Sequence, residues 1–168
     1  GLLKAFARDR VRADAAAAIT QIAFWDEQLV GEGAYLIGRR ARVVAALHKA
    51  IDRHASDLSS RARFGVAYQP RATVDPELLA EEETLDLGVA RAAAAFHADL
   101  EAHRDDEFRR GMTLTGPHRD DLAFSIDGRS LARFGSRGQQ RLGVLALKLA
   151  EADVIAEESG DTPVFLLD

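Results

Sequence analysis

The 168-residue sequence predicts an α+β fold that is mostly helical, on the basis of three observations. Apolar residues recur at helical spacing over most of residues 1–110. Segments in which apolar and polar residues alternate, as in β-strands, are short and lie mainly after residue 110. The hydrophobic fraction of 47% is typical of globular domains and is enough for a buried core.

The first predicted element is a long helix over residues 15–59. Aliphatic residues recur along it every seven positions, in two rows that lie one residue apart around the helix: Ile22, Leu29, Leu36 and Val43 in one, and Val30, Ile37, Val44, Ile51 and Leu58 in the other. Together the rows form one apolar stripe, which another helix has to cover. The stripe therefore favours an amphipathic core helix, and an exposed partner-binding face is the alternative.

A short strand and a second long helix are predicted next. Over residues 61–69, large residues alternate with smaller ones: Phe64, Val66 and Tyr68. The second helix is predicted to begin with Asp75 as its N-cap and Pro76 at its first position. We expect it to continue to about Arg110, where Gly111 ends it.

After residue 110 the sequence predicts a strand, a hairpin, a helix and a strand, in that order. A short strand over residues 112–115 precedes a break at Gly116-Pro117. A further strand follows, in which apolar residues alternate: Leu122, Phe124 and Ile126. The dipeptide Asp127-Gly128 predicts a tight hairpin turn, with a return strand over residues 130–132.

The last predicted helix begins with Ser136 as its N-cap and extends to about Glu158. The apolar run VFLLD at residues 164–168 then predicts a buried and parallel strand. We place a boundary near residues 108–111. It separates a mainly helical lobe, residues 1–110 with a short strand near 64–69, from a second part, residues 111–168.

Composition excludes several classes of protein. The chain has no cysteine, which excludes disulfide scaffolds and thiolate metal sites, so we expect a cytoplasmic location. No segment approaches the roughly 20 apolar residues of a membrane span, and the first residues lack the pattern of a signal peptide. The net charge of −5 argues against a uniformly basic coat. Residues 128–150 nevertheless contain five basic residues and no acid.

One ordered set of residues near the C-terminal end points to phosphate chemistry. Ser136, Gly138 and Gln139 lie at a predicted helix start, where free N–H groups and the helix dipole favour anions. A serine hydroxyl donates to phosphate oxygens, a glycine allows close approach, and Arg137 adds positive charge. Asp168 ends the predicted buried strand, where a carboxylate can hold Mg²⁺ beside a nucleotide.

These residues resemble motifs of ABC-type ATPases. The run Ser136-Arg137-Gly138-Gln139-Gln140 is similar to their signature motif, and Val164–Asp168 is similar to their Walker B strand. Three further segments resemble the RecF family of bacterial DNA replication and repair proteins, which are SMC-like ATPases: LLKAF at residues 2–6, FWDEQL at 24–29 and TGPHRDDL at 115–122.

The resemblance implies an ATPase head related to the SMC class and a largely helical second lobe. Residues 111–168 would then be the C-terminal part of the head, with a β-hairpin, a signature helix and a Walker B strand. Ser136, Arg137, Gly138 and Gln139 would contact ATP held by the other subunit of an ATP-dependent homodimer. Asp168 would be the catalytic carboxylate that binds Mg²⁺.

The resemblance also implies partners and a cellular role. RecF-like proteins bind double-stranded DNA and single-strand/double-strand junctions, act with RecR and help to load RecA at single-strand gaps. The chain would therefore belong to recombinational repair, replication restart and the SOS response, with no membrane partner.

One motif of such an ATPase is missing from the sequence. There is no G-x-x-x-x-G-K-[ST] loop and no Gly-Lys pair, and the residues expected after Asp168 are absent. We therefore expect a piece of a longer protein. The parent is expected to be a weak DNA-dependent ATPase, and this chain alone is expected to be inactive and to bind neither ATP nor Mg²⁺.

Other polar residues allow more than one interpretation. Arg39, Arg40 and Arg42 form a small basic cluster, which is either a solvated helix face or a contact with DNA phosphates. Aromatic and basic residues do not interleave as in proteins that bind single strands. Asp120 and Asp121 are expected to begin a strand rather than to form an acid pair, and the five histidines form no metal-binding pattern. A helical protein-interaction module and a fragment of another SMC-like ATPase remain alternative functions.

Overall fold

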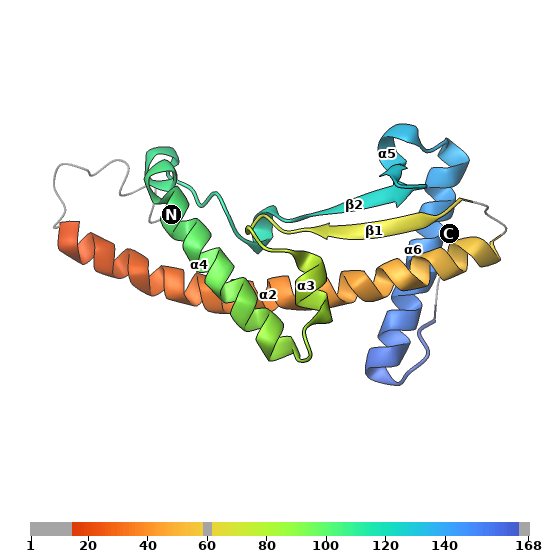
Figure 1. The fold of residues 1–168 in the computed structure, drawn as a ribbon, viewed down its shortest axis with the longest axis horizontal. Coiled ribbons are helices and arrows are strands. Elements are labelled where there is room, and N and C mark those ends of the chain that lie inside the picture. The colour runs from red at the N-terminus through yellow and green to blue at the C-terminus, as the bar shows by residue number, and fades with distance from the viewer. Residues whose placement is uncertain (1–14, 59–61, 165–168) are drawn as a thin grey trace. The chain divides into compact units, whose positions relative to one another are not determined.

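The computed structural model describes residues 15–58 and 62–164 (Figure 1). Its elements are α2 (Ala15–Asp57), β1 (Phe64–Gln69), α3 (Pro76–Glu81), α4 (Leu85–Arg110), η1 (Pro117–Arg119), β2 (Asp121–Ile126), β3 (Arg129–Ser130), α5 (Leu131–Phe134) and α6 (Arg137–Ser159). Three long helices and one small sheet confirm the predicted α+β fold that is mostly helical. None of the helices in these ranges is long and apolar enough to cross a membrane.

The chain divides into two compact units, and α2 contributes residues to both. The first unit consists of residues up to Ala41 together with Gln69–Asp121. The second consists of Arg42–Tyr68 and the chain from Leu122 onward. This division does not follow the predicted boundary near residues 108–111, because β1 pairs with β2 and therefore groups with the later part of the chain. The assignment of residues 111–168 to an ATPase head stays a prediction.

In the first unit, α4 packs antiparallel to the N-terminal part of α2 (Figure 1). Near one end of the contact, an Arg104 Nη2 lies 2.5 Å from the Asp26 carboxylate. Toward the other end, a Cβ on Gly38 would lie 3.2 Å from the Val89 side chain. The core of this unit comes from three helices: Ala34 and Ile37 of α2, Leu79 of α3, and Ala92, Phe96 and Leu100 of α4.

Gly33 allows α2 to lie directly against the buried ring of Phe96. A Cβ at Gly33 would lie 2.6 Å from Phe96 Cε1 and 3.3 Å from Pro117 Cδ. We expect Gly33→Ala to lower the free energy of unfolding by about 1–3 kcal/mol, because the ring has to move within a packed core. Urea denaturation measures this change.

Gly31 on the same helix supplies the control. No atom lies within 4 Å of a Cβ built there. Gly31→Ala is therefore expected to leave stability unchanged or to raise it by up to about 1 kcal/mol, since alanine favours helix more than glycine does. Equal stability of the two alanine variants would contradict the close packing at Gly33.

The second unit contains a three-stranded sheet in the order β1-β2-β3. The β2 and β3 strands are antiparallel, with Ile126 opposite Arg129, and the arrows of β1 and β2 point in opposite directions in Figure 1. The N–H of Asp127 donates to the Arg63 carbonyl oxygen at 2.8 Å. The N–H of Arg63 donates to Asp127 Oδ1 at 2.9 Å, which closes the end of the β1-β2 pair.

The predicted hairpin turn is confirmed at Asp127-Gly128. Both residues have positive φ, at 48° and 74°. This conformation matches the two-residue turn that suits the twist of antiparallel strands, and it explains why an aspartate and a glycine occupy these positions.

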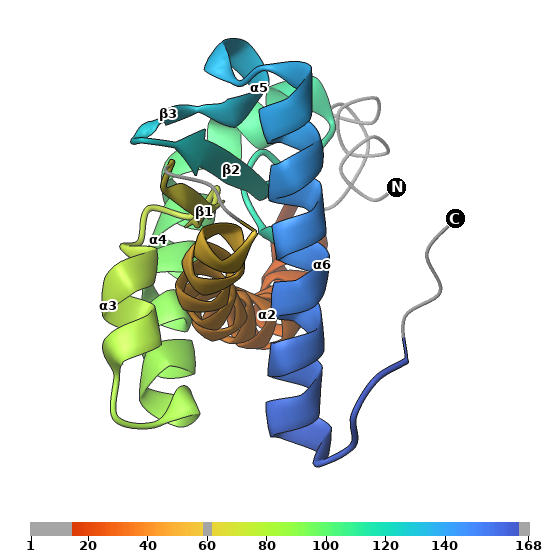
Figure 2. The same ribbon diagram turned by 90° about the vertical axis from the view of Figure 1, so that its right-hand side faces the viewer.

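Helix α6 packs on the sheet and on the end of α2 in the second unit (Figure 2). A Cβ on Gly143 would lie 2.8 Å from Leu131 and 3.2 Å from Phe64, so the helix axis comes close to both. His54 Nε2 lies 2.8 Å from an Asp153 carboxylate oxygen, which links α2 to α6. These contacts leave the N-terminus of α6 exposed beside α5.

The apolar stripe predicted on α2 is confirmed for part of its length. The buried members are Ile22, Ile37, Val44 and Ile51. Leu36 and Leu58 are exposed, at 44% and 38%. Leu47 is also buried, and small residues occupy the other buried positions of the described helix: Gly33, Ala34, Gly38, Ala41, Ala50 and Ala55. These small residues permit close packing, and the pattern of large aliphatic residues does not reveal them.

The prediction of one continuous helix from residue 75 to residue 110 was wrong, because this segment forms two helices. Asp75 is the N-cap of α3, as predicted, and its side chain accepts a hydrogen bond from Glu77 N at 2.9 Å. The α3 helix ends at Glu81, and Thr84 then caps α4 by accepting from Leu87 N at 3.3 Å. A second N-cap inside an otherwise helical segment therefore decided the break.

Two predicted strands also differ from the structure. Residues 112–115 form a loop rather than a strand, since the Glu107 carboxylate, and not a neighbouring strand, accepts from Leu114 N. The return strand predicted over 130–132 is limited to β3, and α5 begins at Leu131. Predictions for LLKAF and for the strand ending at Asp168 lie outside the described residues.

Candidate functional site

The start of α6 is a capping box formed by two of the predicted site residues. Ser136 Oγ accepts a hydrogen bond from Gln139 N at 3.2 Å. In return, Gln139 Oε1 accepts from Ser136 N at 2.8 Å. The two side chains thus hold each other and fix the first turn of the helix. The hydroxyl hydrogen of Ser136 and the amide Nε2 of Gln139 keep donor capacity toward solvent.

The same helix start is open enough for an anion to approach the backbone. A Cβ on Gly138 would meet only Ser136 Oγ, at 4.0 Å. Ser136, Arg137 and Gly138 are all exposed. The first N–H groups of a helix have no partner within the helix and form the positive end of its dipole. The exposed helix start therefore has room for a phosphate group, and phosphate contact by these residues stays a prediction.

Gln140 positions this helix start, a role that the sequence analysis did not assign to it although it belongs to the signature-like run. Its Nε2 lies 3.2 Å from the Gly135 carbonyl oxygen and 3.4 Å from that of Ala132. It also lies 3.5 Å from the Leu131 carbonyl oxygen. Gln140 thereby ties α5 and Gly135 to the first turn of α6. The local signal was a second glutamine directly after the capping residue.

The predicted Mg²⁺ ligand Asp168 lies outside the described residues, so the structure gives no distance between Asp168 and Ser136. Within residues 15–58 and 62–164, His, Asp and Glu side chains form no group of three that could hold a metal ion. The magnesium role of Asp168 stays a prediction.

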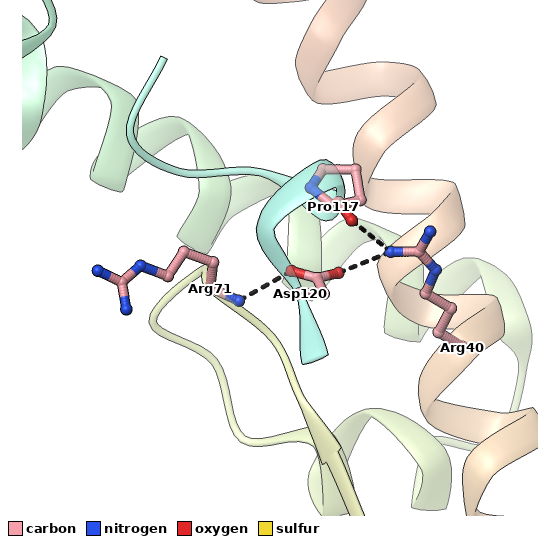
Figure 3. Close-up of polar contacts among 4 residues, drawn as sticks. All are labelled: Arg40, Arg71, Pro117 and Asp120. Carbon is pink, nitrogen blue, oxygen red and sulfur yellow. Dashed lines mark hydrogen bonds and ion pairs between the residues drawn. The ribbon is translucent and has the colours of Figure 1, made fainter. Parts of the chain in front are cut away.

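The three arginines of the predicted basic cluster on α2 are not simply solvated, and Arg40 forms specific contacts within the protein. Arg40 Nη1 donates to the Pro117 carbonyl oxygen at 2.6 Å and to Asp120 Oδ2 at 2.9 Å (Figure 3). Its side chain is 43% exposed, whereas that of Asp120 is 3% exposed. Arg39 and Arg42 are half-buried, and both interact with other groups. Arg40 therefore has a structural role, and DNA contact by the three stays a prediction.

Asp120 connects three segments of the first unit. Its Oδ1 accepts from Arg71 N at 2.9 Å, and its Oδ2 is paired with Arg40 (Figure 3). It lies directly after η1, the single turn that includes Pro117. Asp120 ends that turn and precedes β2, as predicted. The segment TGPHRDDL thus contributes packing and polar contacts within the first unit.

Glu107 is a second buried carboxylate of the same unit and was not singled out from the sequence. It is 1% exposed, and its Oε1 accepts from Leu114 N at 2.6 Å. Burial raises the pKa of the Glu107 carboxyl above its ordinary value of 4.5, although hydrogen bonds from the backbone of Leu114 and Thr115 oppose this shift. The only signal in the sequence was an acid at the end of a long helix.

The raised pKa of Glu107 predicts a pH dependence of stability. A carboxyl whose pKa is higher in the folded state favours folding most at low pH, and this contribution is lost as pH rises from 4.5 through the folded pKa. Glu107→Gln is expected to make the free energy of unfolding fall less steeply over that range, because the amide keeps an acceptor and does not ionise. Urea denaturation at a series of pH values measures the slopes. An unchanged slope in the variant would contradict this assignment.

Relatives of known name match the chain over nearly its whole length. It is 43% identical over 171 aligned residues to the DNA replication and repair protein RecF of Thermomicrobium roseum, covering 99% of this chain and 42% of the relative. It is 41% identical to RecF of Chloroflexus aurantiacus, covering 88% and 36%, and 39% identical to RecF of Herpetosiphon aurantiacus, covering 100% and 39%. No protein-family model matches the chain.

Solved structures of RecF share the fold. A structure of the recombination mediator protein RecF-ATP in the RecFOR pathway superposes with a TM-score of 0.80 at 24% identity, covering 99% of this chain and 41% of that chain. A structure of RecF-ATPrS gives a TM-score of 0.79, covering 96% and 39%. The chain spans about two fifths of the length of the curated relatives that it matches. The RecF relatives at 39–43% identity show that the chain belongs to the RecF family, and the solved structures share its fold.

Proposed function

We propose that this chain is the part of a RecF-type protein that completes the ATP site of a second subunit. The observation that supports this function best is the open and capped start of α6, with Gly138 next to two residues that can donate to phosphate. No G-x-x-x-x-G-K-[ST] loop occurs in the chain. A chain without this phosphate-binding loop can still contact, through its helix start, a nucleotide that another subunit holds.

Each residue of the helix start has a distinct task in this proposal. Ser136 donates its hydroxyl hydrogen to a terminal phosphate oxygen, and Gly138 leaves room for that oxygen near the backbone. Gln139 holds Ser136 in place and offers its Nε2, while Arg137 contributes a positive charge. Asp168 would be the carboxylate ligand of Mg²⁺, an ion that neutralises phosphate charge when it is bound.

The wider role that we propose is ATP-dependent action on DNA during repair. The relatives are named as DNA replication and repair proteins, and the solved structures are named as a recombination mediator in the RecFOR pathway. We infer an ATP-dependent homodimer that is located in the cytoplasm and binds duplex DNA and junctions between single-stranded and double-stranded DNA. This dimer acts with RecR and helps to load RecA at single-strand gaps in DNA. Weak DNA-dependent ATPase activity and participation in the SOS response belong to the same proposal.

The direct test measures association of a longer form of the protein. This form contains the chain together with the other segments that full-length relatives possess. Sedimentation velocity with and without ATP and Mg²⁺ is expected to show dimers only with nucleotide. A monomer at saturating ATP would contradict the proposed function.

A second candidate function is protein interaction through the first part of α2. Phe24 and Trp25 are 55% and 57% exposed, and their rings meet edge to face with centroids 5.4 Å apart. Exposed neighbouring aromatic residues are typical of protein interfaces. Trp25 is the only tryptophan of the chain, so a blue shift of its fluorescence on addition of RecR would support this function. Unchanged emission under conditions where the two proteins associate would exclude it.

A further inference from the structure

Two arginine side chains lie over an exposed aromatic ring beside α6. The guanidinium carbon of Arg129 in β3 is 5.0 Å from the centroid of the Phe134 ring, and that of Arg133 in α5 is 5.8 Å from it. We call these three residues the basic-aromatic cluster. The sequence shows no interleaving of basic and aromatic residues, and the structure brings these three together in space. Arg129 and Phe134 belong to different elements, so the turn from β3 into α5 brings them together.

The positive charge of this cluster is not neutralised by acids in the part of the chain that the structure describes. Neither Arg129 nor Arg133 has a carboxylate within ion-pair distance among those residues. Residues 128–150 contain no acid, and Arg137 and Arg141 in the first turns of α6 are also exposed. Concentrated guanidinium groups in a chain of net charge −5 favour a ligand with several phosphates.

The exposure of Phe134 adds a second and independent feature. Its side chain is 58% exposed, although a large apolar ring usually avoids water. Unpaired bases stack on exposed aromatic rings and on the guanidinium planes of arginines, and arginines also hold the phosphates. Duplex DNA hides the faces of its bases, so the ring favours a single strand.

We infer that the basic-aromatic cluster is a contact site for single-stranded nucleic acid, with one base stacked on Phe134 and phosphates held by Arg129 and Arg133. The inference deepens the proposed action on DNA by naming the surface and the form of DNA. It does not depend on ATP, because the contact uses none of the residues proposed to hold the nucleotide. Its test is therefore carried out without nucleotide.

The experiment measures fluorescence anisotropy of a labelled poly(dT) oligonucleotide with the whole chain over a range of salt concentrations. We expect the double variant Arg129→Gln, Arg133→Gln to weaken binding about tenfold at low salt. Its slope of log affinity against log salt should fall by about 1.4, since two phosphate contacts are lost. Phe134→Leu is expected to weaken binding about fivefold or more, and Phe134→Trp to preserve it.

Arg91 provides a matched control outside the cluster. Its guanidinium is also exposed, at 54%, but it pairs with Glu82 at 2.6 Å. Arg91→Gln is expected to leave oligonucleotide affinity unchanged, and circular dichroism establishes that each variant is folded.

Three results would overturn the inference. The first is the absence of any binding of the oligonucleotide by the unmodified chain. The second is full affinity in Phe134→Leu, which would leave only a general attraction to polyanions, including duplex DNA. The third is unchanged oligonucleotide affinity and an unchanged salt slope in the double variant Arg129→Gln, Arg133→Gln. A failure of dimerisation in the unmodified longer protein would contradict the ATP proposal and leave the oligonucleotide result intact.

Discussion

Ser136→Arg is expected to abolish ATP-dependent dimerisation of the longer protein. The change removes a hydroxyl donor and places a long side chain where Ser136 Oγ lies 4.0 Å from the Cβ position of Gly138. A hydrogen bond to a charged group contributes about 1.5–3 kcal/mol, and a symmetric dimer would contain two such sites. The variant therefore loses the free energy of this hydrogen bond at both sites, and we expect the dimer association constant to fall at least about a hundredfold. Sedimentation velocity at saturating ATP measures it.

The control for this variant uses the other end of the same helix. Ser159 is the last residue of α6 and is exposed. Ser159→Arg adds the same side chain there, where a positive charge suits the helix dipole, and should leave dimerisation intact. Ser136→Arg also removes the N-cap, at a cost of about 0.5–2 kcal/mol of stability. Thermal unfolding distinguishes that cost from lost association, and normal dimerisation in a folded Ser136→Arg variant would refute the proposed role of α6.

Asp120→Ala is expected to lower the free energy of unfolding by about 2–4 kcal/mol. The Asp120 side chain is almost fully buried and accepts from Arg71 N and Arg40 Nη1, both at 2.9 Å (Figure 3). Without it the Arg71 N–H loses its acceptor. Arg40 keeps its bond to the Pro117 carbonyl oxygen but loses its counter-charge. Urea denaturation of the chain measures the change.

Two comparisons isolate the Asp120 interaction. Asp105 is an exposed aspartate of α4 in the same unit, so Asp105→Ala should change stability by less than about 0.5 kcal/mol. A double-mutant cycle of Asp120→Ala with Arg40→Ala should give a coupling energy of about 1–3 kcal/mol. Additive effects of the two substitutions would show that the Arg40–Asp120 contact is not an energetic unit.

Local sequence signals predicted the ends of several elements correctly. Asp75 before Pro76, Asp127-Gly128 and Ser136 each act within a few residues, through a cap or a turn, so neighbouring sequence is sufficient to identify them. The same locality explains why the capping residues of the candidate site could be named in advance. Thr84 acts by the same chemistry and was missed, because the helical pattern on both sides of it appeared continuous.

Contacts that form only on folding decided what the sequence pattern could not. Residues 112–115 were predicted as a strand from their local pattern, but the buried Glu107 carboxylate binds their backbone and holds them as a loop. Arg40 appeared to belong to a basic face for DNA, yet it turns toward Asp120, which lies 80 positions later. Neither partner can be identified from spacing along the chain, since both depend on how the elements pack.

The sequence by itself therefore determined the mostly helical α+β class, the hairpin and the capped start of α6, because these follow from periodicity and from hydrogen bonds between close neighbours. The tertiary structure decided which face of α2 is core, where Arg40 and Glu107 act, and that Arg129 and Arg133 lie over Phe134. The physical reason is that burial, ion pairing and ring contacts depend on how the elements pack, so they exist only after the chain has folded, whether the residues are 80 positions apart or five.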